Sequence, residues 1–350
     1  MTDHSSNPRA ASRANSLYTL LIFVSMLLVL IVVILSAYLR LSGSGLGCAE
    51  WPSCYALIRA EASGAESLAA AHLVPPWATV THRLVASVLG VLVLGITVMA
   101  LRRRKEPGQS ILIPLAVLGL TVFLSILGYK TPSPLLPWVT LSNLLGGMTM
   151  LALLWWLGQR SVSTETENAQ RHELRPWTLV GIFIVFFQIA LGGWVSANFA
   201  ALACTNLPGC GGYPWSDGPW RESFNLFRVL PVTDAGAVIT GDTGKIIHLA
   251  HRAGAAFTFL YTGWLGWRAV RQGSRFRGTG IAMLFFLMLQ MLLGVAAVAF
   301  SLPLGLVTAH NAIAALLLLS VVNLDHLLTP QKAKWPWPRS RIRNKSPPGC

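Results

Sequence analysis

Residues 17–39 have the sequence LYTLLIFVSMLLVLIVVILSAYL, a run without a single charged side chain. An α-helix needs about 20 apolar residues to cross the hydrocarbon core of a bilayer, because each residue adds about 1.5 Å to its length. The apolar core of a cleaved signal peptide is shorter, at about 7–15 residues. The run therefore predicts a membrane-spanning helix that stays in the protein.

Seven further apolar runs follow along the chain. They cover 77–101, 111–129, 135–157, 177–203, 246–267, 279–302 and 304–324. Only 11% of the residues are charged, whereas a soluble chain has about 25% charged residues. Pro303 separates the last two runs and predicts a tight helical hairpin. We expect an all-α integral membrane protein with eight transmembrane helices.

The basic residues lie mostly on one side of this predicted topology. Of the 27 Lys and Arg, 19 fall before the first run, in the connections after the second, fourth and sixth runs, or after the eighth. The positive-inside rule makes that side cytoplasmic. We therefore expect a multi-pass protein of the cell inner (plasma) membrane with both termini in the cytoplasm. The net charge of +14 then reflects topology, and we expect contact with membrane lipid and none with nucleic acid.

Four of the five cysteines form two matched pairs. Cys48 and Cys54 enclose AEWPS, and Cys204 and Cys210 enclose TNLPG, with the proline at the same place. Both pairs follow the outer end of a predicted helix, on the side of the membrane where disulfides persist. We expect a disulfide in each pair that closes its loop, with a redox or metal-binding role as the alternative.

The helices repeat as well. Gln188-x-x-x-Gly192 in the fifth predicted helix has an echo in Gln290-x-x-x-Gly294 in the seventh. We therefore predict two tandem four-helix bundles. The expected divisions are a cytoplasmic tail (1–16), an N-terminal half (17–157), a cytoplasmic linker (158–176), a C-terminal half (177–327) and a basic cytoplasmic tail (328–350).

Several histidines fall at one depth of the predicted membrane. His82-Arg83 in the second helix and His251-Arg252 in the sixth are equivalent positions of the repeat, about 8–10 Å below the outer surface. His310 lies at a similar depth in the eighth helix. Imidazole and guanidinium groups are costly inside a bilayer, so they are candidates for a functional site.

Facing imidazoles in a helix bundle are typical ligands of haem. The neighbouring arginines would then pair with the haem propionates. No Cys-x-x-Cys-His motif occurs, so the haem would be bound without covalent attachment. The alternative for these histidines is a hydrogen bond between helices. His248 is a further candidate, as a second ligand, a propionate donor or a packing residue. No Asp or Glu lies within any apolar run, which argues against a proton or cation pump.

Taken together, these motifs resemble the haem A synthase family, over about 17–327. The motifs that resemble it are Tyr38-x-Arg40-Leu41-Ser42-Gly43-x-Gly45-Leu46-x-Cys48, the two cysteine pairs, Gln188-Ile189-Ala190-Leu191-Gly192-Gly193-Trp194, Ile247-His248-x-x-His251-Arg252 and Ala309-His310-Asn311.

The resemblance implies a haem site in each half. In the second half, a non-covalent haem b would be held between His251 and His310, with Arg252 at its propionates. In the first half, haem O would be the substrate and would face His82 and Arg83. Oxidation of its ring methyl to a formyl group gives haem A for terminal oxidases. The implied partners are a haem O synthase, the oxidase assembly machinery and an electron acceptor of unknown identity.

Three positions of the first half differ from the family pattern. Thr79 stands where the family usually has a Glu, Asn143 where the fourth helix has a His, and Leu124 where the third helix has a Gln. A non-catalytic haem b cytochrome or a haem-handling assembly factor is therefore an alternative to the enzyme. A transporter is a third interpretation and predicts no bound haem. Small residues such as Gly146 and Gly193 allow close helix packing, either within one chain or in a homo-oligomer.

Overall fold

The computed structural model describes residues 8–43, 76–106, 109–130, 136–162, 173–206, 209–211, 217–233 and 238–329. Within these residues the regular structure is helical, apart from an isolated bridge between Val232 and Val238. The helices are α1 (Pro8–Gly43), α3 (Pro76–Arg102), α4 (Leu112–Lys130), α5 (Pro137–Val162), α6 (Arg175–Ala197), η2 (Ala200–Leu202), α7 (Trp220–Ser223), α8 (Gly241–Arg271), α9 (Ser274–Ala299) and α10 (Leu304–Leu328). The expected all-α class is confirmed.

Seven of the described helices are long and apolar enough to span a membrane. They are α1 over Ser16–Ser42, α3, α4 over Leu112–Tyr129, α5, α6, α9 and α10. Helix α8, at 31 residues, is also long enough. It contains His248, His251 and Arg252 within its first half, and these polar side chains lower its mean hydropathy. The polar residues that suggested a site are thus the reason that α8 is less apolar than its neighbours.

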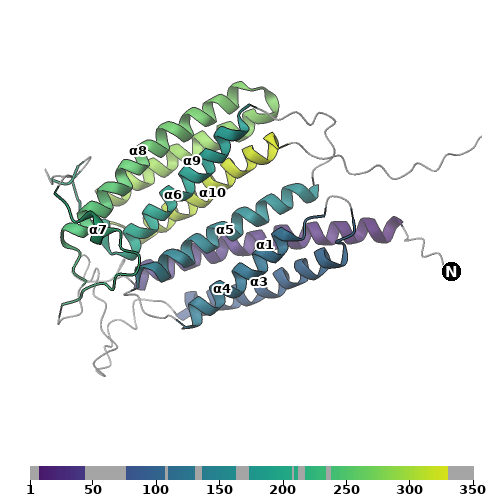
Figure 1. The fold of residues 1–350 in the computed structure, drawn as a ribbon, viewed down its shortest axis with the longest axis horizontal. Helices are drawn as coiled ribbons and strands as arrows, with labels where there is room; N and C mark the ends of the chain where they lie inside the picture. Colours follow the sequence, from purple (N-terminus) through teal and green to yellow (C-terminus); the bar gives the residue numbers. More distant parts are fainter. Residues whose placement is uncertain are drawn as a thin grey trace, which may run out of the picture.

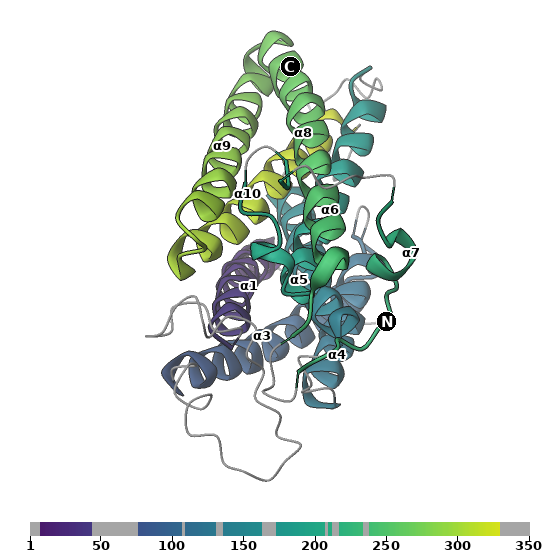
Figure 2. The same cartoon turned by 90° about the vertical axis from the view of Figure 1, so that its left-hand side faces the viewer.

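The long helices lie side by side along the long axis of the molecule (Figure 1). Helix α1 packs against α3 and α5, and α4 packs against α3 and α5. The same pattern recurs in the second half, where α6 packs against α8 and α10, and α9 packs against α8 and α10. Contacts of α10 with α1 and α5, and of α5 with α6, join the two sets. Seen from the end that carries α7, the helices α8 and α9 lie at one edge and α3 and α4 at the other (Figure 2).

The outward faces of these helices are apolar. Large hydrophobic side chains remain more than half exposed there, among them Leu84, Val91, Phe183, Leu260 and Phe285. In water such a surface would be unfavourable, whereas lipid tails solvate it as well as a protein interior does. The exposed apolar side chains agree with the expected membrane location.

Helix α6 ends earlier than the apolar run 177–203 predicts. It stops at Ala197, because the next residues leave the helical conformation: Phe199 has φ of 53° and is followed by the 3-10 turn η2. The buried Asn198 side chain donates a hydrogen bond from Nδ2 to the Trp194 carbonyl oxygen at 2.9 Å, which satisfies one of the last acceptors of the helix. The prediction of one continuous helix to 203 was therefore wrong at its end.

The expected hairpin between the last two helices is confirmed. Ser301 and Leu302 adopt positive φ values, of 56° and 61°, and Pro303 occupies the N-cap position of α10. The tight connection brings the C-terminal end of α9 next to the N-terminal end of α10. As a consequence, Gln290 and His310 come together across the two helices.

Polar side chains also connect the halves near the opposite end. Gln159 of α5 donates to Asn323 of α10 at 2.6 Å, and Asn323 donates to Thr279 of α9 at 2.9 Å. Asp325, 4% exposed, lies 3.7 Å from the Nε of Arg175 on α6. These contacts fix α10 between α5, α6 and α9.

Candidate cofactor-binding site

A cavity of about 330 Å³ lies among α6, α8, α9 and α10. Most of its lining is aliphatic, and it contains no Asp or Glu among the described residues. The polar side chains that line it are Arg40, Gln188, Ser196, His248, His251, Arg252, Thr258, Gln290, His310 and Asn311. The structure thus places His251, Arg252, His310 and His248, all predicted from sequence, around one space.

His251 is held against α6 by the first Gln-x-x-x-Gly motif. The Nε2 atom of Gln188 lies 3.0 Å from Nδ1 of His251 and also donates to the His251 carbonyl oxygen at 3.0 Å. One turn further along α6, a Cβ added to Gly192 would lie 3.0 Å from Cε1 of the imidazole. The glutamine therefore orients the ring, and the glycine leaves the space that the ring occupies.

His310 is held against α9 in the same way. The Nε2 atom of Gln290 lies 3.0 Å from Nε2 of His310, and a Cβ at Gly294 would lie 3.1 Å from the Cε1 of that ring. The repeated motif noted in the sequence is thus an imidazole seat that occurs twice, once from α6 to α8 and once from α9 to α10. The sequence indicated the repeat but not its role.

The donor groups that line this cavity fit a haem. Two imidazoles from different helices line it, and Nδ1 of His310 is buried without a hydrogen-bond partner among the described residues. A carboxamide can present either its oxygen or its nitrogen to an imidazole. With the oxygen facing a ring N–H, the opposite ring nitrogen keeps its lone pair for a metal, which is the usual arrangement behind a histidine ligand. Among the described residues, no group of three or more His, Cys, Asp or Glu could hold a metal ion by itself.

Adding a methyl group to either seat is expected to displace its imidazole. In Gly192→Ala and Gly294→Ala, the new Cβ would lie about 3 Å from a ring carbon, closer than nine in ten real Cβ contacts. We expect each variant to lose at least part of the low-spin absorbance of bound haem b. Gly128→Ala is the matched control, because Gly128 follows Leu124 at the same spacing and its Cβ would meet nothing within 4 Å. Unchanged spectra in both test variants would contradict the assignment.

Arg252 lines the cavity, and it also holds the outer loop. Its guanidinium donates to the carbonyl oxygens of Cys204 and Asn206, each at 2.6 Å, and of Gly209 at 2.5 Å. Cys204 and Cys210 form a disulfide with a Cα–Cα separation of 4.8 Å, as the spacing led us to expect. Cys48 and Cys54 lie outside the described residues. A contact between Arg252 and propionates stays a proposal, because the hydrogen bonds of the described residues go to the loop.

Arg252→Gln and Arg252→Lys are expected to loosen the loop to a similar degree. Lysine keeps the positive charge but lacks the planar fork that donates to three carbonyl oxygens at once. A hydrogen bond from a charged group contributes about 1.5–3 kcal/mol, so we expect dithiothreitol to reduce the Cys204–Cys210 disulfide about ten-fold faster or more in both variants. Peptide mapping measures that rate. If the Cys204–Cys210 disulfide of Arg252→Lys were reduced as slowly as that of the wild type, the positive charge alone, and not the planar guanidinium, would hold the loop.

The predicted residues of the first half do not meet this cavity. His82 is half-buried on α3, one residue before the exposed Arg83, and α3 packs against α1 and α4. Leu124 of α4, which stands in the place of a glutamine, packs against α5 where a Cβ at Gly146 would lie 2.6 Å from it. Asn143 lies half-buried one turn earlier on α5. Leu124 therefore makes an apolar contact with α5, whereas Gln290 in the second half contacts the imidazole of His310.

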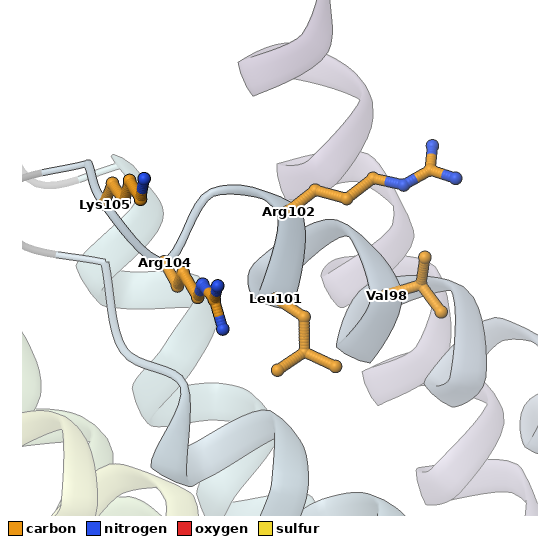
Figure 3. Close-up of a pocket in the computed structure, with 5 residues that line it drawn as sticks. All are labelled: Val98, Leu101, Arg102, Arg104 and Lys105. Carbon is orange, nitrogen blue, oxygen red and sulfur yellow. The ribbon is translucent and has the colours of Figure 1, made fainter.

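A second hollow, of about 490 Å³, lies at the C-terminal end of α3. Val98 and Leu101 line it together with Arg102, Arg104 and Lys105. Figure 3 shows Arg104 and Lys105 on the turn after the helix, while Arg102 extends from its last turn in another direction. The described lining includes neither His nor Gln. Basic side chains at this level agree with the positive-inside rule, and the hollow has no part in the candidate site.

Arg40, Ser196 and Asn311 line the cavity as well, although we did not predict them from the sequence. A signal for two of them was present, because Arg40 and Ser196 each lie eight residues before the first cysteine of a pair. They are equivalent positions of the repeat. The structure brings both to the same cavity, one from α1 and one from α6.

Comparison with known proteins agrees with this architecture. The sequence profile of the cytochrome oxidase assembly protein family matches residues 19–322. The chain is also 35% identical over 322 residues to a protein named heme A synthase from Shewanella oneidensis, which covers 89% of this chain and 96% of that protein. Both matches include the first half with His82 as well as the second half with the cavity. The chain belongs to the cytochrome oxidase assembly protein family.

Proposed function

We propose that this protein is a haem A synthase-type membrane oxidoreductase, which oxidises the methyl group of haem O to a formyl group and so provides haem A for terminal oxidases. The observation that supports this most strongly is the duplicated imidazole seat around one cavity, in a chain that is 35% identical to a heme A synthase. Oxidation of a methyl to a formyl group, by two hydroxylations and loss of water, removes four electrons and introduces one oxygen atom. An electron acceptor is therefore required.

In the second half, His251 of α8 and His310 of α10, which line the same cavity, would hold the iron of a non-covalent haem b. When bound there, haem b supplies a one-electron carrier within the membrane. Gln188 and Gln290 orient the two rings, and the aliphatic lining excludes water. His248, which is 4% exposed, lines the outer side of the same space.

In the first half, His82 and Arg83 would face the substrate haem O. Thr79 and Asn143 supply a hydroxyl and a carboxamide, which can position a substrate by hydrogen bonds but cannot act as a carboxylate base. Among the described residues of the first half, His82 is the histidine that would hold the iron of haem O. A single imidazole ligand would suit a substrate that is oxidised, whereas two imidazoles would suit a carrier.

The proposed setting is the cell inner membrane, with both termini cytoplasmic. Helix α8, the sixth predicted helix in chain order, would bring the number of spans from seven to eight. Its length of 31 residues exceeds what the bilayer requires, and its polar residues face the cavity. The recurring order of helix contacts supports two tandem four-helix bundles. A haem O synthase, the oxidase assembly machinery and an electron acceptor are the proposed partners, together with a homo-oligomer. Gly146 and Gly193 do not themselves argue for that oligomer, because they pack against Leu124 and Leu144 of the same chain.

Complementation tests the proposed function. The full chain would be expressed in a bacterium that lacks its own haem A synthase but retains a haem A-containing oxidase. We expect the haem A absorbance of the oxidase to return. An oxidase that stays without haem A, although the full chain is present in the membrane, would contradict the proposal.

A non-catalytic haem b cytochrome is the second candidate, favoured by Thr79, Asn143 and Leu124. It predicts that the chain is inactive as it stands. If activity appeared only after Thr79→Glu and Asn143→His were combined, this candidate would replace the enzyme.

A further inference from the structure

A basic turn follows helix α3 at the end of its apolar span. The run 102–105 has the sequence RRRK, and its first residue is the last of the helix. The backbone N–H groups of Arg103 and Arg104 donate to the carbonyl oxygens of Met99 and Leu101, at 3.1 and 3.3 Å. The turn is therefore fixed by the helix, and it lies where a membrane-spanning helix leaves the hydrocarbon.

One of these four basic residues packs against helix α1. The guanidinium carbon of Arg103 lies 5.7 Å from the centre of the Tyr18 ring, and Nε2 of Gln109 donates to the Tyr18 hydroxyl at 3.1 Å. The other three are exposed and line the hollow of about 490 Å³, together with Val98 and Leu101. The turn thus divides the basic run between contacts with the protein and an open hollow.

Arg102, Arg104 and Lys105 have no anionic partner in the described part of the chain. The nearest carboxylate in sequence, Glu106, forms a salt bridge with none of them. Arg102 extends from the last helical turn, and the other two extend from the turn after it, so that cations reach the hollow from two segments (Figure 3). Three positive charges around one hollow favour an anionic ligand there.

The apolar part of the hollow indicates what kind of anion fits. Val98 and Leu101 continue an exposed stripe that begins with Val91 and Leu94, a spacing that places all four side chains on one face of α3. They are between 38% and 70% exposed. A soluble anion gains nothing from such a stripe, whereas a phospholipid has acyl chains directly beneath its phosphate. The positive-inside rule explains the charges but not their position at the end of this stripe.

We propose that the hollow binds an anionic phospholipid, with its headgroup at Arg102, Arg104 and Lys105 and an acyl chain along Val98 and Leu101. The planar guanidinium matches the geometry of phosphate oxygens. Basic side chains at the surface of a membrane attract anionic lipids. The described lining includes none of the candidate haem ligands, so this site is independent of the haem in either half.

The experiment titrates the purified full chain in nonionic detergent with phosphatidylglycerol and counts bound lipid by native mass spectrometry. The combined variant Arg102→Gln/Arg104→Gln/Lys105→Gln should bind it about 100-fold more weakly, because each basic residue at a membrane surface contributes about a five-fold gain in affinity. Arg104→Gln alone should cost about five-fold, and it provides the test if the triple variant fails to insert. An unchanged affinity in these variants would overturn the proposal.

The matched control removes three exposed arginines around the connection between α8 and α9. The variant Arg268→Gln/Arg271→Gln/Arg277→Gln loses the same net charge, and none of its positions lines the hollow. We expect it to bind phosphatidylglycerol as the wild type does. Equal weakening in both triple variants would show a general attraction between opposite charges, and the proposal of a site would be wrong.

Three further probes identify the ligand as an anionic lipid. Phosphatidylcholine has acyl chains but no net charge, glycerophosphoglycerol has the anionic headgroup without acyl chains, and inorganic phosphate has the charge alone. We expect all three to bind the wild type more weakly than phosphatidylglycerol. For the two soluble anions the difference should exceed about 100-fold, since each buried CH₂ of an acyl chain contributes about four-fold in affinity. Equal binding of any of the three would contradict the proposal.

Discussion

Replacing His251 or His310 by alanine is expected to remove the low-spin haem b spectrum from the purified protein. A low-spin iron needs two strong axial ligands, and each imidazole is the only histidine that its helix seats against a Gln-x-x-x-Gly motif. Loss of one ligand leaves a five-coordinate, high-spin iron or an empty cavity. The sharp α-band of the reduced protein would disappear in both variants, and optical and electron paramagnetic resonance spectra would record it.

His326→Gln is the control for this experiment. His326 is as buried as a ligand would be, at 4% exposed, and its ring lies edge-on to Trp156 with a centroid distance of 5.2 Å. It is near the opposite end of α10 from His310, so a loss of packing there should leave the haem spectrum in place. A low-spin spectrum that survived in His251→Ala or His310→Ala would contradict the assignment of that ligand.

Replacing His82 by alanine is expected to slow conversion of haem O about a hundred-fold while haem b stays bound. His82 is on α3, which does not contribute to the described lining of the cavity, so the cofactor site should be unaffected. Loss of the group that holds a substrate in place typically costs about a hundred-fold in rate. Extracted haems would be separated by chromatography, and the bound haem b would be measured by its spectrum.

Ser87→Ala is a suitable control on the same helix. Ser87 is exposed and donates to the Arg83 carbonyl oxygen at 2.9 Å, so its removal changes α3 without changing His82. We expect conversion to continue in this variant. If His82→Ala removed haem b instead, the first half would hold the resident cofactor and the assigned roles of the halves would be wrong.

The apolar runs predicted most of the fold, because lipid requires that nearly every residue of a span be apolar. Hydropathy predicted the helices least well where the local backbone conformation or the polar side chains of a site decided the structure. Helix α6 stops at Ala197, although the run continues, because Phe199 adopts a left-handed conformation that no hydropathy pattern indicates. Helix α8 is the least apolar of the long helices for the opposite reason, since it contains His248, His251 and Arg252.

The sequence predicted the two candidate haem ligands of the site, but not the residues that surround them. His251 and His310 were recognisable because imidazoles are costly in a membrane, and the structure places both at one cavity. The partners of Arg252 depend on how the loop after α6 folds back over α8, which spacing does not reveal. The presence of Arg40 at the cavity depends on contacts between residues far apart in sequence, since Arg40 and Ser196 are more than 150 residues apart. Such contacts follow from packing and not from a local motif.

Haem extraction after co-expression tests the central claim most directly. The full chain would be produced together with a haem O synthase, in a host that makes no haem A of its own, and the extracted haems would be separated by chromatography. We expect haem A, or its hydroxylated intermediate, to appear while haem O decreases. A protein that contains haem b while haem O accumulates unchanged would contradict the claim and identify the chain as a cytochrome without synthase activity.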